Sequence, residues 1–135
     1  MKMVKSIAVL FLLLLPILIF GNPSYVELNN LAIIRGVGVS CDDSFSLYLQ
    51  ELIPVKEDNG ITYQYHYYQE KNRVFSKAFH SLRENADKKL YLSHVHYVVT
   101  DCKKSDFIIQ ELNIKPDIIY HIPKDVLKKL KETKS

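Results

Sequence analysis

The sequence predicts an α/β fold, a mixed β-sheet of about five strands with two to three helices, preceded by a signal peptide. Three observations lead to this prediction. The chain opens with a positively charged and then apolar segment, strand-like segments follow, and from residue 72 onward segments with helical spacing alternate with strands. Hairpin neighbours are antiparallel, whereas strands joined through a helix run parallel, so the sheet should be mixed.

The N-terminus has the plan of a secretory signal. Lys2 and Lys5 precede an apolar run, Ile7–Phe20, and Gly21 then offers a small residue where a signal peptidase could cut. An uncleaved anchor stays open as an alternative, because Ile19 and Phe20 suit a cleavage site poorly. Export is expected in both cases, either as a secreted protein or as one attached to the extracytoplasmic side of a membrane.

After a signal peptide at residues 1–21, residues 22–135 are long enough for one domain and too short for two. Acidic and basic residues nearly balance in this part, so no nucleic-acid partner is expected. The C-terminal tail alone has a local excess of lysine. The lysines are Lys124, Lys128, Lys129, Lys131 and Lys134. They form either a solvated helix face or a surface that contacts anionic lipid.

The first strand is expected at Leu31–Val39, where almost every residue is apolar or β-branched. Turn formers follow it at Cys41–Ser44. In Phe45–Val55, apolar residues alternate with polar ones that include Tyr48 and Gln50, which predicts a second strand with one buried face.

A hairpin should follow the second strand. Lys56–Gly60 is a polar turn that closes on Asn-Gly, a strong reversal signal, and it leads into a third strand at Ile61–Gln69. From Val74 to Leu82 the apolar residues recur at helical spacing, with Asn72 as the cap and Asn85 near the end.

The remaining segments continue the alternation. A long strand is expected at Leu90–Thr100, and a helix capped by Ser105 at Asp106–Leu112. A short strand then spans Ile118–Ile122. Pro123 opens a terminal helix whose inward residues are Val126, Leu127 and Leu130.

Two separated motifs resemble one known family. The stretch Glu27–Asp43, ELNNLAIIRGVGVSCDD, is similar to the start of the mature part of the Ger(x)C family, the C-type lipoprotein subunits of bacterial spore germinant receptors. Tyr68–Thr100 resembles, in the same register, the strand and helix after the family's first hairpin, most specifically at Lys88–His94, KKLYLSH. Ile118–Leu130 looks like a shortened version of the family's next strand and helix. The resemblance covers only the family's N-terminal domain, so the chain looks truncated.

The resemblance implies an exported, non-enzymatic accessory subunit that acts in spore germination by contact with membrane-embedded germinant receptor subunits. Asn22 occupies the position expected for the lipid-bearing cysteine, and an amide cannot form the thioether, so no lipid anchor is expected. Membrane association would then depend on an uncleaved signal or on the partner. The alternative is a stand-alone secreted α/β binding protein, or a truncated family remnant with no receptor role.

Enzyme chemistry finds little support in the sequence, and we expect neither catalytic nor cofactor-binding residues. Asp42, Asp43 and Asp101 are explained by turn chemistry. Gly36 and Gly38 lie inside a strand without the helix start that a phosphate loop requires, so they should allow a close approach of another backbone or a bulky side chain.

The histidines and cysteines raise two further questions. His94 and His96 would share a face of one strand, but no further ligand has a recognised spacing, and we expect no metal site. Cys41 and Cys102 each follow the end of an expected strand. If those strands are parallel neighbours, the two residues can form a disulfide; a reducing setting would leave them as thiols.

The third strand supplies the candidate interface, which consists of Tyr63, Tyr65, Tyr67 and Tyr68. Tyrosine offers a large contact area and tolerates partial wetting. Tyr63, Tyr65 and Tyr67 share one face of the strand, and Tyr68 lies on the other. The alternative is that the first three line the core under a helix.

Overall fold

The computed structural model describes residues 2–20 and 30–133, with side chains in residues 2–16 and 30–133. The chain divides into two units, Met1–Asn30 and Leu31–Ser135. In the first unit, helix α1 (Lys2–Phe20) exposes the side chains described in it. Among the described residues, no helix combines the length and the apolar character needed to cross a membrane. Gly21 and Asn22, on which the cleavage and anchor predictions rest, lie outside the described residues.

The second unit is built on a mixed sheet, which confirms the predicted α/β class. The strands follow the order β3-β2-β1-β5-β6, and β4 pairs with β1. The β1–β2 and β2–β3 pairs are antiparallel, and the other pairs are parallel. The strands are β1 (Leu31–Cys41), β2 (Phe45–Glu57), β3 (Gly60–Asn72), β4 (Lys89–Tyr91), β5 (Tyr97–Thr100) and β6 (Ile118–His121).

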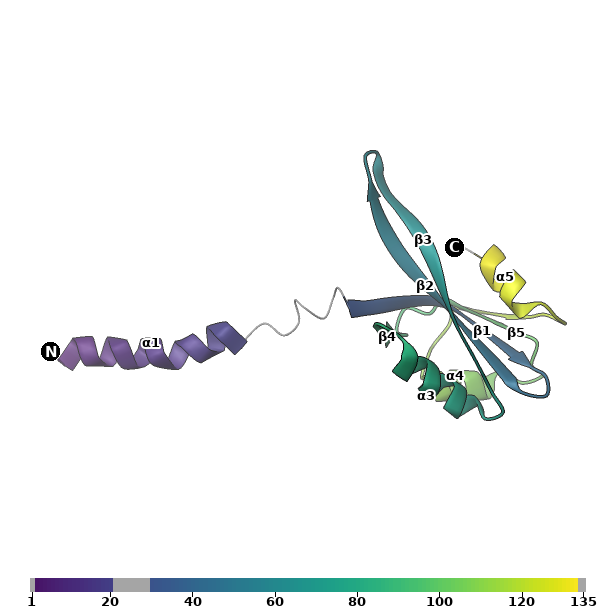
Figure 1. The fold of residues 1–135 in the computed structure, drawn as a ribbon, viewed down its shortest axis with the longest axis horizontal. Coiled ribbons are helices and arrows are strands. Elements are labelled where there is room, and N and C mark those ends of the chain that lie inside the picture. The colour runs from purple at the N-terminus through teal and green to yellow at the C-terminus, as the bar shows by residue number, and fades with distance from the viewer. Residues whose placement is uncertain (1, 21–29, 134–135) are drawn as a thin grey trace. The chain divides into compact units, whose positions relative to one another are not determined.

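Helices cover both faces of this sheet (Figure 1). On one face lie α3 (Phe75–Asn85) and α4 (Asp106–Leu112), and on the other lies α5 (Val126–Glu132). The larger core lies under α3 and α4, because their apolar residues repeat at helical spacing and meet the inward residues of the central strands. Its fully buried members include Val37, Val39, Leu47, Leu49, Val98 and Ile108.

The smaller core lies under α5, where Val126 and Leu130 pack with Tyr97 of β5. Two glycines of β1 make this packing possible. A Cβ on Gly36 would clash with the ring of Tyr97, and a Cβ on Gly38 would lie 2.9 Å from Cγ1 of Val126. The close approach expected at these glycines from the sequence is therefore what the structure has.

The prediction of one strand over Leu90–Thr100 is wrong. The chain forms β4 and β5 with a turn between them, in which the N–H of Val95 donates to the carbonyl of Leu92 at 3.3 Å. Both strands pair with β1, whose register to β2 shifts between Ile34 and Gly36. The N–H of His96 reaches the carbonyl of Arg35 at 2.8 Å, so β1 supports the segment where the strand is broken.

The limits of α3 and α4 agree with the sequence, whereas the prediction that Pro123 opens the terminal helix is wrong, because α5 begins only at Val126, after Asp125 in a left-handed conformation (φ 60). The side chain of Ser105 makes no capping hydrogen bond to α4, and its carbonyl instead accepts from the N–H of Ile108 at 3.1 Å. Asn72 does supply a side-chain hydrogen bond just before α3, since its Oδ1 accepts from the N–H of Val74 at 3.0 Å. Of the inward residues expected in the terminal helix, Val126 and Leu130 are buried and Leu127 is half-buried.

A double-mutant cycle tests the packing of α5. We expect Gly38→Ala to lower the free energy of unfolding by about 1–3 kcal/mol, because the added Cβ meets Val126 in a filled space. In a Val126→Ala background the obstructing Cγ1 is gone, so the same change should cost much less. Urea unfolding of the four proteins measures the coupling. Equal costs in the two backgrounds would contradict this packing.

Candidate functional site

The β2–β3 hairpin is the most prominent feature of the sheet and projects from it (Figure 1). Its strands pair without a register shift from Phe45 opposite Asn72 to Glu57 opposite Gly60. Gly60 has φ +134, a conformation that favours glycine and completes the reversal expected from Asn-Gly. In the half near the core, β2 is buried at Leu47 and from Leu49 to Glu51, and β3 is half-buried or exposed. The distal half, from Pro54 through the turn to Gln64, is mostly exposed.

Three candidate tyrosines follow one face of β3 from solvent toward α5. Tyr63 is 57% exposed, and Tyr65 and Tyr67 are half-buried. Nζ of Lys131 lies 5.5 Å from the centre of the Tyr67 ring, a cation–π arrangement that joins α5 to the hairpin. Neither the interface nor the core interpretation describes all three residues. The face is exposed at Tyr63 and becomes part of the smaller core at Tyr67.

The buried side-chain amide of Gln50 fixes the position of the Tyr67 ring beside α5. Gln50 is fully buried, and its Nε2 donates to Oη of Tyr67 at 3.0 Å and to the carbonyl of Leu130 at 3.1 Å. The hydroxyl of Tyr97 contacts Oε1 of Gln50 and lies 2.6 Å from the carbonyl of Thr133. The last carbonyls of a helix have no partner within it, so Gln50 and Tyr97 satisfy the C-terminal end of α5.

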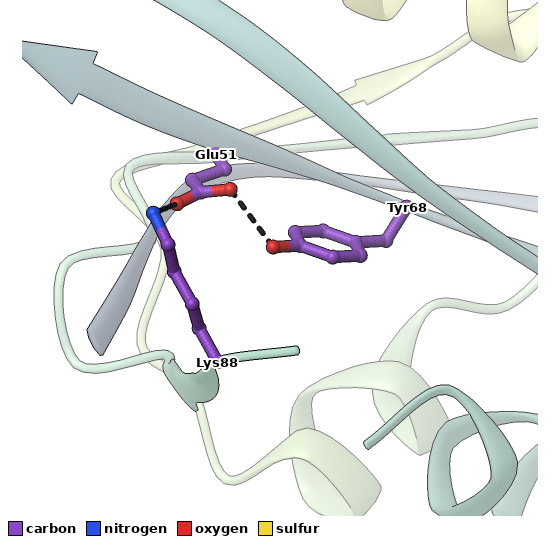
Figure 2. A network of polar contacts seen from close by, with 3 residues as sticks. All are labelled: Glu51, Tyr68 and Lys88. Atoms are coloured by element: carbon purple, nitrogen blue, oxygen red, sulfur yellow. Dashed lines mark hydrogen bonds and ion pairs between the residues drawn. The ribbon is translucent and has the colours of Figure 1, made fainter. Parts of the chain in front are cut away.

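Tyr68, the fourth candidate, lies on the opposite face and belongs to a different network (Figure 2). Its hydroxyl donates to Oε2 of Glu51 at 2.9 Å, and Nζ of Lys88 lies 3.1 Å from Oε1 of the same carboxylate. Burial raises the pKa of the Tyr68 hydroxyl, and the hydrogen bond to Glu51 and its charge add to this shift. Tyr68 therefore cannot share one contact surface with the other three tyrosines.

The side chain of Glu51 is 3% exposed and that of Lys88 is 37% exposed. A buried carboxylate is stable only if its lost hydration is replaced by hydrogen bonds or an opposite charge. Tyr68 of β3 supplies a hydrogen bond, and Lys88, before β4, supplies a positive charge. Sequence reasoning missed Glu51 and placed Gln50 on a polar strand face. Both are buried because α5 and the segment around Lys88 cover β2, and neither neighbour is visible in the local pattern.

The two cysteines form a disulfide, with Cα atoms 5.1 Å apart. Cys41 is the last residue of β1, and Cys102 follows the end of β5, the parallel neighbour in which Thr100 lies opposite Val39. Asp101 fixes the same corner, since its carboxylate accepts from the hydroxyl of Ser40 and from the N–H of Cys41, both at 2.7 Å. Closing a loop of this length stabilises the fold by about 4 kcal/mol in the chain-entropy model.

Within the part of the chain that the structure describes, one group of side chains could in principle hold a metal ion. It consists of Cys41, Asp101 and Cys102, whose potential ligand atoms lie within 4.8 Å of one another. The two sulfurs are bonded to each other, so they are not thiolate ligands while the disulfide stands. His94 and His96 lie in the loop between β4 and β5, so the prediction that they share a face of one strand is wrong. The ring of His94 packs against Tyr91, and Nδ1 of His96 lies 2.9 Å from the carboxylate of Asp117.

The lysine-rich tail packs partly against aromatic rings. Lys129 lies over Tyr120, with Nζ 5.3 Å from the ring centre, as Lys131 does over Tyr67. Lys124 and Lys128 are exposed, and Lys134 lies outside the described residues.

Comparison with known proteins gave no match, whether to a protein-family model, to a curated protein or to a solved structure. The Ger(x)C resemblance therefore stays a prediction that rests on its two motifs. Within the second motif, Lys88 has a structural task that its family-like position alone did not reveal, which is to neutralise Glu51.

Removing the partner of Glu51 should destabilise the domain. We expect Lys88→Met to lower the free energy of unfolding by about 1–3 kcal/mol, because the carboxylate stays buried without its cation, while the partial exposure of Lys88 limits the loss. Glu51→Gln in the Lys88→Met background should recover much of it. Lys103→Met, at an exposed position, is the matched control. A Lys88→Met loss no larger than that of the control, in denaturant unfolding, would contradict this account.

Alkaline titration tests the buried tyrosines. Burial raises the pKa of Tyr97 from 10.0 to about 12, so the folded protein keeps a proton that the unfolded chain has lost. The stability contributed by this group is complete below pH 10 and is lost as the pH rises toward 12. We expect Tyr97→Phe to remove a late step from the tyrosinate absorbance titration and to flatten the fall of stability above pH 10. An unchanged titration would refute the burial effect.

Proposed function

We propose that this protein is an exported, non-enzymatic accessory subunit of a spore germinant receptor and acts by protein contact at the membrane. The proposal combines the two Ger(x)C-like motifs with a surface suited to contact. The disulfide between Cys41 and Cys102 supports an extracytoplasmic location, because such bonds persist in oxidising compartments.

One observation carries the proposal. Ile61 and Tyr63, alternate residues on the same face of β3, are 64% and 57% exposed near the end of a regularly paired hairpin. Large apolar side chains that stay in water in this way are typical of contact sites. They are also held in place, because the ladder between β2 and β3 continues to the turn. A partner would therefore meet a preformed surface and little ordering entropy would be lost.

In this proposal Ile61 and Tyr63 are the anchors, and the charged turn at residues 56–58 forms the polar rim around them. The partner is a membrane-embedded receptor subunit that offers an apolar recess on its extracytoplasmic side. Attachment to the membrane would come from this contact, or from an uncleaved signal.

Capture of the receptor subunits from membranes of a spore-forming host tests the proposal. We expect Ile61→Ser and Tyr63→Ser each to weaken capture about tenfold, which corresponds to about 1.4 kcal/mol of binding free energy. Both side chains are exposed, so thermal stability should change little.

Ile118→Ser is the matched control, since Ile118 is 50% exposed on β6, away from the hairpin. It should capture as the unchanged chain does. Equal binding of the protein to membranes that lack the receptor subunits would overturn the receptor proposal and favour the stand-alone secreted binding protein. Equal weakening by all three substitutions would exclude the hairpin as the specific surface.

A further inference from the structure

The two faces of the sheet carry charges of opposite sign. Successive residues of a strand point to opposite faces, and residues that pair across strands share a face, so the register assigns each strand residue to a side. The lysines of the strands are exposed on the side of α5; they are Lys56, Lys71 and Lys89. The glutamates of the strands point to the side of α3 and α4; they are Glu51, Glu57 and Glu70.

The helix on the basic side adds to this charge. In residues 124–132, four lysines stand against only two carboxylates, those of Asp125 and Glu132. Three of the four lysines are exposed, namely Lys124, Lys128 and Lys131. The side of the sheet that α5 covers is therefore a basic surface, to which both the strands and the helix contribute.

The same side holds most of the exposed apolar side chains. Within residues 30–133, six large apolar side chains are exposed, and one of them, Val74, lies just before α3. The other five lie on the side of α5; they are Ile33, Ile61, Tyr63, Tyr91 and Ile118. Lysines and exposed apolar groups thus share one face of the domain, around the short helix at its centre (Figure 1).

This combination suits the surface of an anionic bilayer. Tyrosine and aliphatic side chains are favourable at the depth of the lipid headgroups, while the ammonium groups of lysines reach the phosphates. The five apolar side chains come from β1, β3, β4 and β6. A protein partner would need a recess matched to each of these dispersed side chains, whereas lipid adapts to any spacing. The dispersion therefore favours a lipid surface over a second protein on this face.

We propose that the α5 side of this domain rests on an anionic phospholipid surface, with Lys124, Lys128 and Lys131 facing the phosphates and the exposed apolar side chains entering the headgroup region. The lipid contact does not depend on the proposed receptor role. It is compatible with that role, because a domain held in this way turns Ile61 and Tyr63 toward the membrane, where an embedded partner lies.

Labelling of lysine amines on the unmodified full chain tests the contact. The protein is added to protein-free vesicles of phosphatidylcholine alone, or of equal parts phosphatidylcholine and phosphatidylglycerol. Because residues 7–20 are apolar, the chain can associate with both kinds of vesicle, so the readout must report the domain itself. Mass spectrometry should show that Lys124, Lys128 and Lys131 lose reactivity on the anionic vesicles alone. Lys77, exposed on α3, should react equally on both.

Substitution of single lysines gives the second measurement. We expect Lys124→Gln and Lys128→Gln each to lower the preference of the full chain for anionic over neutral vesicles by about fivefold. Lys77→Gln is the matched control, since it removes the same charge from the other side of the sheet and should leave the preference unchanged. All three side chains are exposed, so thermal stability should change little.

Three outcomes would overturn the proposal. The first is equal reactivity of the α5 lysines on the two kinds of vesicle, and the second is a loss from Lys77→Gln as large as that from Lys128→Gln. The third is protection of the α5 lysines only in membranes that contain the receptor subunits, which would assign this face to an acidic protein partner instead. None of the three bears on the hairpin contact, which is measured with the receptor subunits present.

Discussion

The architecture depends on the unequal faces of β1, the strand that pairs with β2, β4 and β5. Toward α3 and α4 it presents Val37 and Val39, which fill the larger core. On the side of α5 stand Gly36 and Gly38, where any Cβ would meet Tyr97 or the helix itself. This difference between the two faces permits close packing. A short helix can lie directly against β1 only where the strand carries glycine on the facing side.

The position of α5 in turn determines the polar interior. Once the helix lies against β1, Gln50 and Tyr97 are within reach of its last carbonyls, and Tyr67 is held through Gln50. On the other face, Glu51 and Tyr68 fix the hairpin to the segment that carries Lys88. The near half of the hairpin is therefore anchored on both faces, while its distal half keeps an ordered ladder and exposed apolar side chains. Stability and a surface available for contact come from the same two strands.

Local patterns in the sequence predicted what local physics controls. The alternation in β2, the Asn-Gly reversal and the helical spacing in α3 each specify an element without help from distant residues. The approximate limits of α4 and β6 followed in the same way. The burial of Gln50 and Glu51, and the break between β4 and β5, could not be predicted, because they depend on α5, Lys88 and β1, which lie far away in the sequence. Equally, the tyrosine spacing of β3 showed which residues share a face, and it could not show where along that face α5 ends.

Protein contact through an anchored, projecting hairpin is the central claim, and residue-resolved amide hydrogen exchange tests it most directly. The measurement compares the protein in membranes that contain the germinant receptor subunits with the same concentration in membranes that lack them. The account predicts that added protection is concentrated at the distal hairpin around Ile61 and Tyr63, while exchange in β1 and β5 is slow in both. Added protection centred on α3 or β6, or no difference between the two membranes, would contradict it.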